Sequence, residues 1–392
     1  MSFLPDLTIS SFSYDLPDDR IAVYPAKPRD SAKLLVYQEG RIQDSVVSNL
    51  GAYLQESDCW VANNTQVIPA RLWFQTEGGA IVQVFLLKSL GDDWTCWEAL
   101  VGNRKRFKAE SVLRSENAQG DFISVQWEDR EQNRVILQSN RSSIHDALEL
   151  FGRIPLPPYI KRSDSSSDKD DYQTLFAKHK GAVAAPTASL HFTPELRERL
   201  ISHGLDELEL TLHVGAGTFK PVSQENLREH DMHAETFVIT QSLIEGLLRR
   251  GRGVIALGTT SMRVLESLYY LACRLKQDPH SSLFVASDDP YKPNWPPMST
   301  REALDFLLQI CQDRGGELKG ETQIFIVPGF EFRLVDRIMT NFHQPQSTLL
   351  VLISAFIGHA WTEVYSHAMA HEYRFLSYGD ASLLCREKKI EW

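Results

Sequence analysis

GAVAAPTASLHF (residues 181–192) and LTLHVGAGTFKPV (residues 210–222) enclose a helical interval, and the rest of the chain is organised around them. Small residues let a ligand approach the backbone closely, and Gly215 and Gly217 tolerate a positive φ angle without strain. His191 and His213 each follow an apolar residue at a predicted strand end or loop, where scaffolds commonly present reactive side chains. The stretch is compatible with a binding site and equally with two histidines of ordinary structural use.

The composition is that of a globular protein large enough for two or three domains. The chain has 392 residues, of which 43% are hydrophobic and 23% are charged. Its five cysteines lack the close spacing of a disulfide framework or a structural zinc site. No signal peptide is recognisable, and the longest apolar run, 349–357, is too short to cross a bilayer. We therefore expect a cytoplasmic protein without membrane association.

The charge balance argues against extensive contact with nucleic acid. The chain has 41 basic and 51 acidic residues, a net charge of −10, whereas phosphate contacts need cations. A local patch can still suffice. The densest basic cluster spans 104–108, and Lys161 with Arg162 forms another. Each cluster taken singly is more typical of a solvated turn.

Residues from about 72 to 153 read as a compact antiparallel β module. The segments AIVQVFLLKSL, WTCWEALVGN, FISVQWED and NRVILQS are β-branched or aromatic and are separated by polar turns. This spacing predicts a small barrel. The helix SSIHDALELFG closes the module, and the stiff connector RIPLPPYIKR follows it. Residues 172–392 then alternate strands and helices, which indicates an α/β domain.

Several elements of this second part bear on a site. A helix is predicted over 194–203, and a strand over 254–257 runs into the helix GTTSMRVLESLYYLACRL. Thr259, Thr260 or Ser261 would be its N-cap, and the free amides of such a helix start attract a carboxylate or phosphate. The string VDRIMTNFHQPQSTLLVLISAFIG (335–358) is predicted to form a helix, a loop and a second helix, with Asn341 and His343 on the loop. Residues 276–316 look like an insertion.

Familiar cofactor and nucleophile motifs do not occur. GAGTFK lacks the third glycine of a dinucleotide-binding fingerprint, and GTTSMR lacks the G-K-[ST] of a phosphate-binding loop. HDMHAE (230–235) offers two histidines and a carboxylate, to which His191, His213 or His343 could add a zinc ligand, but the spacing matches no metal signature. No G-x-S-x-G elbow or cysteine nucleophile motif is present. The remaining histidine, asparagine, arginine, threonine and glycine residues suit proton transfer and anion binding, and we expect no metal.

Nine strings, taken together and in order, resemble one family. They span nearly the whole chain: NNTQVIPARL (63–72), IPLPPYIKR (154–162), YQTLFAKHKGAVAAPTASLHF (172–192), TLHVGAGTFKPV (211–222), HDMHAE (230–235), GTTSMRVLES (258–267), TQIFIVPGFEF (322–332), TNFHQPQSTLLVLISAFIG (340–358) and EYRFLSYGDA (372–381). With these motifs the chain resembles the S-adenosylmethionine:tRNA ribosyltransferase-isomerase family of queuosine biosynthesis.

The resemblance implies a reaction. Family members transfer and isomerise the ribosyl part of S-adenosylmethionine onto 7-aminomethyl-7-deazaguanine at the wobble position of tRNA. Epoxyqueuosine-tRNA, adenine and methionine result. The implied partner is the tRNA anticodon arm, S-adenosylmethionine is a co-substrate, and no prosthetic group is implied. We expect a monomer.

The resemblance also implies an architecture. A larger mixed α/β domain, with a barrel-like sheet and flanking helices, would comprise residues 1–71 and 154–392. A small antiparallel β-barrel would be inserted early into it, in agreement with the module read at 72–153. The sequence itself adds 276–316 as an extra insertion within the larger domain.

The implied chemistry assigns hypothetical roles by residue type and motif membership. The sulfonium acidifies the C5′ protons, so a base is needed: His213, His191, or Glu235 if its pKa is raised. The leaving adenine could be bonded by Asn63, Asn64 or His343. Arg263, with the helix start at Thr259 and Thr260, could clamp the methionine carboxylate.

Other residues of the motifs are expected at the substrate or at tRNA. Further substrate contacts are expected from Arg71, Gly215, Gly217, Thr218, Asn341, Arg374, Tyr378 and Asp380. The expected tRNA contacts are Arg104, Lys105, Arg106, Lys161 and Arg162, with the anticodon arm lying across both domains.

Three features depart from the family pattern. Gln66 stands where the family usually has arginine, Ser189 stands where it usually has glycine, and 276–316 is longer than in typical members. Gln66 removes a cation and Ser189 adds bulk beside His191, so the chain could instead be a paralogue of the family. Such a protein would bind an S-adenosylmethionine-like or nucleoside ligand without turnover.

Overall fold

The main body of the protein is built around a ten-stranded mixed sheet. The structure, a computed structural model, describes residues 3–215, 224–251 and 253–386. The strands are, in spatial order, β15 (Phe284–Val285), β16 (Glu317–Thr322), β13 (Glu235–Thr240), β12 (Asp206–Leu212), β3 (Cys59–Asn63), β14 (Val254–Leu257), β17 (Arg337–Asn341), β18 (Ala381–Cys385), β1 (Lys33–Gln38) and β2 (Arg41–Val46). The consecutive neighbours β12, β3, β14 and β17 run parallel, whereas β18 is antiparallel to β17.

Helices cover this sheet on both faces. The α-helices are α1 (Ile144–Phe151), α2 (Asp168–Asp171), α3 (Pro194–Ser202), α4 (Gln241–Arg250), α5 (Gly258–Gln277), α6 (Thr300–Asp313), α7 (Thr348–Ile357) and α8 (Ala360–Ala370). The 3₁₀ helices are η1 (Ile9–Ser11), η2 (Asp18–Arg20), η3 (Arg29–Ser31), η4 (Val47–Tyr53), η5 (Arg104–Arg106), η6 (Thr187–His191), η8 (Leu227–Glu229) and η9 (Asp289–Tyr291).

The alternation of side chains along β3 shows how the two layers form. Val61 belongs to the same apolar cluster as Leu268 of α5, while Trp60 belongs to the cluster that contains Leu196 of α3. All residues of β3 and β14 are buried. Such continuous apolar runs are typical of parallel strands covered on both faces. The mixed α/β prediction is confirmed in this coarser form.

Two local predictions about the second part are wrong. Helix α5 begins at Gly258 with Leu257 as its N-cap, so the three hydroxyl residues 259–261 lie inside the first turn. Gly258 has a φ of +85°, which lets the chain pass directly from strand to helix. In place of the first helix predicted within 335–358 the chain forms strand β17, because β14 and β18 pair with it on both sides.

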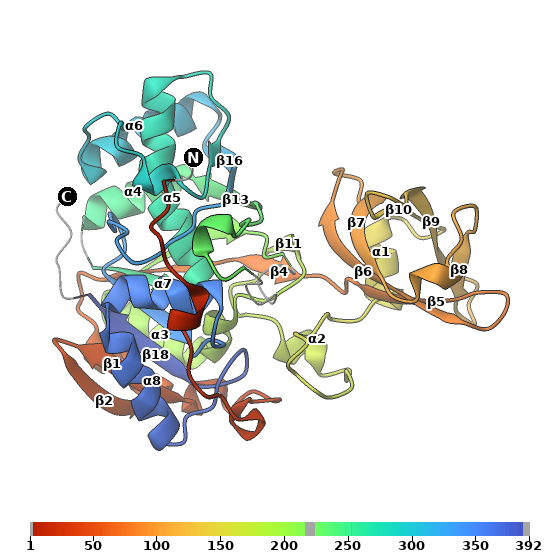
Figure 1. Ribbon diagram of the computed structural model, residues 1–392, viewed down its shortest axis with the longest axis horizontal. Helices are drawn as coiled ribbons and strands as arrows, with labels where there is room; N and C mark the ends of the chain where they lie inside the picture. Colours follow the sequence, from red (N-terminus) through yellow and green to blue (C-terminus); the bar gives the residue numbers. More distant parts are fainter. Residues whose placement is uncertain (1–2, 216–223, 252, 387–392) are drawn as a thin grey trace.

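A second, smaller sheet stands to one side of the main body (Figure 1). Its order is β5 (Arg71–Gln75), β6 (Ile81–Ser89), β7 (Cys96–Val101), β10 (Arg134–Ser139), β9 (Phe122–Asp129) and β8 (Leu113–Glu116), antiparallel throughout. Trp97, Val125 and Leu137 pack with Ala147 of α1 in its core. No ladder joins β5 to β8 in the described parts of the chain, so the barrel stays a prediction.

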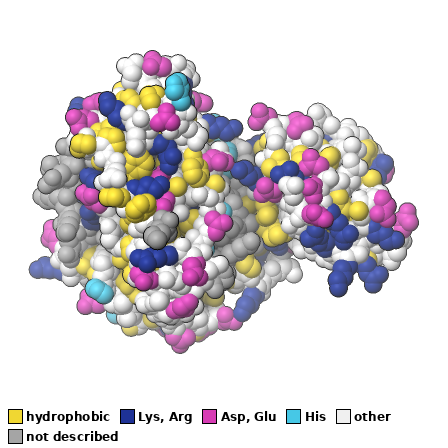
Figure 2. Space-filling model, turned by 45° about the horizontal axis from the view of Figure 1, so that its top comes forward, with side chains coloured by type: hydrophobic (Ala, Val, Ile, Leu, Met, Phe, Trp, Pro, Cys, Tyr) yellow, Lys and Arg dark blue, Asp and Glu magenta, His cyan; other side chains and the backbone are white. Residues whose placement is uncertain are grey.

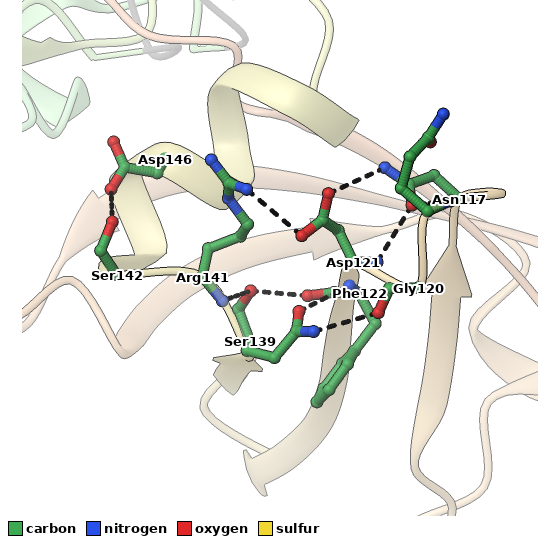
Figure 3. A network of polar contacts seen from close by, with 10 residues as sticks. Asn117, Gly120, Asp121, Phe122, Ser139, Arg141, Ser142 and Asp146 are labelled. Carbon is green, nitrogen blue, oxygen red and sulfur yellow. Dashed lines mark hydrogen bonds and ion pairs between the residues drawn. The ribbon is translucent and has the colours of Figure 1, made fainter.

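Polar side chains tie the β8–β9 turn of the small sheet to the end of β10. The Asp121 carboxylate accepts hydrogen bonds from Asn117 Nδ2 and Arg141 Nη1, both at 3.2 Å (Figure 3). Asn140 bridges the same turn, accepting from Phe122 N at 2.8 Å and donating to Gly120 O at 3.0 Å. The small sheet is therefore held by its own apolar core and its own polar contacts.

The chain enters and leaves the small sheet at one place. Arg71 and Arg153 exchange two backbone hydrogen bonds, of 3.1 and 2.9 Å. Beside them β4 (Thr65–Val67) pairs in parallel with β11 (His179–Ala182). A Cβ on Gly152 would lie 2.0 Å from the Pro69 carbonyl, so only glycine fits where the two chain segments cross.

Among the described residues no single helix has the length and apolar character of a membrane span. Helices α7 and α8 meet that criterion only as a pair bent by 115°, on length and composition alone.

Candidate active site

A cavity opens where strands β14 and β17 end. Its walls come from residues 184–188, 258–260 and 340–344, and from Ser377. Because β14 and β17 are parallel, their carboxyl ends meet at one edge, which is the usual place for ligands in open α/β sheets. The motif segment 181–192 and the helix start at 258 are therefore brought together here.

A larger cleft of about 920 Å³ lies between the small sheet and the main body. Residues 87–92 face it from the small sheet, and His213, Gly215 and Glu235 face it from the main body. Val214 lines both the cavity and the cleft, so the two spaces adjoin. Lys88 Nζ contacts Glu321 Oε1 across the cleft at 3.0 Å.

The start of α5 forms one wall of the cavity. Leu257 offers no side-chain cap, which leaves the first amides of a 20-residue helix facing this wall. The hydroxyls of Thr260 and Ser261 are buried without a hydrogen-bond partner among the described residues. Amides and hydroxyls at a helix N-terminus can receive an anionic group such as a carboxylate.

His191 lies behind Asn341 and outside the direct lining of the cavity. Asn341 Nδ2 lies 3.2 Å from His191 Nε2, and Asn341 Oδ1 accepts from Thr187 Oγ1 at 3.0 Å. With Oδ1 accepting, the amide donates and His191 Nε2 is the acceptor. Burial lowers the pKa of His191 to about 4, so the ring is neutral. His191 thus orients Asn341, and its Nε2 is already occupied.

His343 lines the cavity from the loop after β17. Its Nε2 lies 3.0 Å from Thr340 Oγ1, and burial lowers its pKa to about 3. Its backbone is held on both sides, with the amide donating to Tyr365 Oη at 3.0 Å and the carbonyl accepting from Tyr14 Oη at 2.5 Å. His343 is therefore a rigidly placed neutral imidazole.

His213 faces the cleft. Its Nδ1 lies 2.9 Å from Thr65 Oγ1, and burial lowers its pKa to about 4. Gly181 packs closely against the ring, and a Cβ there would lie 2.8 Å from two ring atoms. The imidazole is neutral near pH 7, and Nε2 is the ring nitrogen that the threonine does not use.

Glu235 and Arg263 form a buried ion pair. Arg263 Nη1 donates to Glu235 Oε2, and the second carboxylate oxygen accepts from Gly215 N at 3.3 Å. Burial alone would raise the pKa of Glu235, but the Arg263 charge and the bonds around it lower the pKa to about 2. Glu235 was expected to act as a base only if its pKa were raised, and its pKa is lowered instead. Arg263 Nη2 remains without a partner among the described residues.

Asn63 and Asn64 are occupied in holding strands together. Asn63 Oδ1 accepts from the amides of Thr65 and Leu212, and its Nδ2 donates to Leu212 O at 2.9 Å. Asn64 Oδ1 accepts from Thr211 Oγ1 at 2.7 Å, and its Nδ2 donates to Glu209. Their amides are committed to the β3–β12 junction, which argues against the adenine-binding role expected from the sequence.

Arg71 and the segment 374–380 also serve the scaffold. Arg71 lies at the joint with the small sheet, where its Nη2 donates to Leu156 O at 3.4 Å. Asp380 accepts from Arg374 through the backbone amide at 2.8 Å and through Nη2 at 3.2 Å. This turn, which includes the buried Tyr378, presents Ser377 to the cavity. The two predicted residues Gly217 and Thr218 lie outside the described residues.

Sequence reasoning missed some residues of the cavity wall. Ser377 Oγ lies 2.6 Å from Tyr159 Oη, and both line the cavity. Thr187 bonds Asn341, and Ser347 caps α7. Each lies in or beside one of the motif strings, but the residue type alone does not show that a serine, threonine or tyrosine faces a cavity.

The predicted tRNA contacts differ in their availability. Lys105 and Arg106 are exposed on η5, whereas Arg104 bonds Arg130 O and stacks over Trp127 at 5.4 Å. Figure 2 shows Lys and Arg side chains gathered at the lower edge of the small sheet's lobe. Arg162 is paired with Asp168 at 2.6 and 3.0 Å in a buried contact, and Lys161 contacts Asp18 at 2.5 Å. Arg162 is therefore committed to the fold.

The histidines of the motif HDMHAE contact a glutamine and a glutamate in the described part of the chain. His230 Nδ1 lies 3.4 Å from Gln224 Oε1, and His233 Nε2 lies 3.4 Å from Glu235 Oε1. In the described ranges, no group of three potential ligands includes either histidine.

Comparison with known proteins defines the class as a tRNA-modifying transferase-isomerase. The model of the family "queuosine biosynthesis protein" matches residues 9–384. Curated relatives named S-adenosylmethionine:tRNA ribosyltransferase-isomerase include those of Syntrophomonas wolfei, 38% identical over 96% of this chain and 97% of the relative, and of Rhodospirillum rubrum, 40% identical over 96% and 98%. The chain belongs to the queuosine biosynthesis protein family, and the family predicted from the motifs is confirmed.

A solved structure is also similar in sequence. The crystal structure of an S-adenosylmethionine tRNA ribosyltransferase from Thermotoga maritima is 28% identical and covers 96% of this chain and 100% of its own, with a TM-score of 0.48.

Proposed function

We propose that this protein transfers and isomerises the ribosyl moiety of S-adenosylmethionine onto 7-aminomethyl-7-deazaguanine at the wobble position of tRNA. Adenine and methionine leave, and epoxyqueuosine-tRNA is the product. The observation that carries the proposal is the 37–40% identity, across nearly full length, to curated proteins named for this activity. S-adenosylmethionine and tRNA are then co-substrates.

The start of α5 is proposed to bind the methionine carboxylate. The first amides of the helix and the buried Thr260 hydroxyl support this role, because they are donors that find no acceptor within the described ranges. Thr259 lines the same wall. Arg263, which is paired with Glu235 through Nη1, would contribute its Nη2, which has no partner among the described residues.

His213 is proposed as the base that removes a C5′ proton. It is neutral at pH 7 because burial disfavours its cation, and Thr65 sets the ring orientation through Nδ1. Its position in the cleft beside Val214 supports the role, since Val214 also borders the cavity. His191 would act through Asn341, and Asn341 with His343 would bond the leaving adenine.

The tRNA anticodon arm is proposed to lie across the cleft and the exposed basic residues of the small sheet. Lys105, Arg106 and Lys108 support this placement, because they are exposed. The corresponding division is a main domain of 1–71 and 154–392, an inserted barrel at 72–153, and a further insertion at 276–316. The protein is proposed to act as a monomer.

Incubation with S-adenosylmethionine and tRNA carrying 7-aminomethyl-7-deazaguanine tests the proposal. We expect one adenine per modified tRNA, and a nucleoside mass that matches epoxyqueuosine. The rival is a paralogue that binds without turnover. It draws support from Ser189, whose buried hydroxyl has no partner among the described residues and lies two positions from His191. Folded protein that binds substrate yet releases no adenine would favour the rival.

A further inference from the structure

A cluster of metal-binding side chains lies at the edge of the main sheet, away from the cavity and the cleft. Asp44 projects from edge strand β2, His367 lies near the end of α8, and His371 is the residue that follows that helix. Their potential ligand atoms all lie within 4.8 Å of one another. All three side chains are at least partly exposed, so an ion can reach them from solvent.

The separations in this cluster are close to those of a coordination sphere. His367 Nε2 lies 2.9 and 3.1 Å from the two Asp44 oxygens, and the rings of His367 and His371 are 3.8 Å apart at 15°. Ligands at typical zinc distances lie about 3.4 Å from one another in a tetrahedron. Histidines four positions apart share a helix face, which explains why both imidazoles reach the same point.

Outer hydrogen bonds already orient two of the three ligands. His371 Nδ1 contacts His367 O at 2.9 Å, which leaves Nε2 as the nitrogen that can bind an ion. Tyr373 Oη donates to Asp44 Oδ1 at 2.6 Å. Lys33 Nζ donates to the carbonyls of His371 and Glu372 and so holds the turn after α8. Outer bonds of this kind to imidazole and carboxylate ligands are typical of protein metal sites.

We propose that Asp44, His367 and His371 bind a divalent transition-metal ion, Zn²⁺ in the first instance, with water completing the coordination. Two imidazoles and one carboxylate suit zinc better than magnesium or calcium, which prefer oxygen ligands throughout. The ion would tie the β1–β2 hairpin to α8, two elements far apart in sequence. This role is independent of the proposed ribosyl transfer.

Calorimetric titration of the untagged, metal-stripped protein with Zn²⁺ tests the site. We expect one saturable site in the unchanged chain and its loss in the double variant H367Q/H371Q. Asp44→Asn should weaken binding at least tenfold. His280→Gln, which changes an exposed histidine elsewhere, is the matched control and should bind as the unchanged chain does. Equal binding by the double variant would overturn the proposal.

A second measurement distinguishes a specific, preorganised site from nonspecific binding of Zn²⁺ by surface histidines. Tyr373→Phe keeps all three ligands but removes the bond to Asp44, and should weaken Zn²⁺ binding about tenfold. Zn²⁺ should raise the melting temperature of the unchanged chain and leave that of H367Q/H371Q where it was. If Tyr373→Phe bound Zn²⁺ with unchanged affinity, and Zn²⁺ shifted the melting temperatures of the unchanged chain and H367Q/H371Q equally, the binding would be nonspecific.

Discussion

Polar side chains are buried at one edge of the main sheet and exposed at one edge of the small sheet. The cavity edge is the end of strands β14 and β17 with the adjoining cleft, and the basic edge is the loop that carries Lys105 and Arg106. Around the cavity and the adjoining cleft, imidazoles, amides and an ion pair are buried, and burial keeps His191, His213 and His343 neutral. On the small sheet, Lys105 and Arg106 stand in solvent. Buried neutral groups suit proton transfer in a fixed geometry, whereas exposed cations suit reversible contact with phosphate. The function proposed above therefore places chemistry and tRNA capture in different parts of one chain.

Replacing His213 is the strongest test of this division between chemistry and tRNA binding. His213→Gln should lower turnover by about 10²–10⁴-fold while the fold is retained, because a positioned base contributes that much. Single-turnover release of adenine measures it. His203→Gln is the control, since that exposed ring contacts the carbonyl of Arg199 in its own helix, at 2.6 Å. If His213→Gln turned over normally, another group would be the base.

The buried ion pair tests whether the cavity edge depends on charge as well as on shape. Glu235→Gln leaves the Arg263 guanidinium buried without a counter-charge, and should cost about 3–5 kcal/mol of unfolding free energy in urea. Glu331→Gln breaks an exposed contact with Arg333 and should cost at most about 1 kcal/mol. A similar cost for the two variants would show that the buried pair contributes no more than a surface one.

Acid should destabilise the cavity edge through its histidines. The pKa of His191 is about 4 when folded and near 6.5 when unfolded, so the unfolded chain binds more protons between these values. Stability is therefore complete above pH 6.5 and is lost as pH falls toward 4, by on the order of 3 kcal/mol for this residue. His191→Gln should show a shallower loss in urea titrations between pH 6.5 and 4.5. Parallel curves would show that His191 does not titrate in this way.

Neutralising the basic edge should weaken tRNA binding alone, and this is the smallest effect that we expect. Lys105→Gln with Arg106→Gln should raise the KM for tRNA about tenfold and leave the KM for S-adenosylmethionine unchanged. The slope of log affinity against log salt should fall by about 0.7–0.9 for each lost phosphate contact. Arg301→Gln, on the exposed face of α6, is the control. An unchanged salt slope would place tRNA elsewhere.

The sequence alone determined the family and much of the local structure. The order of the motif strings identified the family, and the apolar run 254–257 is strand β14 with the predicted bounds. Helix α3 begins at Pro194 as predicted, because Thr193 caps it and Pro194 suits a first helical position. These features depend on neighbours in the sequence, where local propensity and capping decide.

Tertiary structure decided which of the motif residues are free to act. Asn63 and Glu235 look like ligand and base in the sequence, yet strand partners and Arg263 occupy them. Asp44 and His367 lie 323 positions apart and meet only because β2 and α8 pack together. Hydrogen-bond partners and desolvation come from segments that are distant along the chain, so residue type alone does not reveal which side chains remain available.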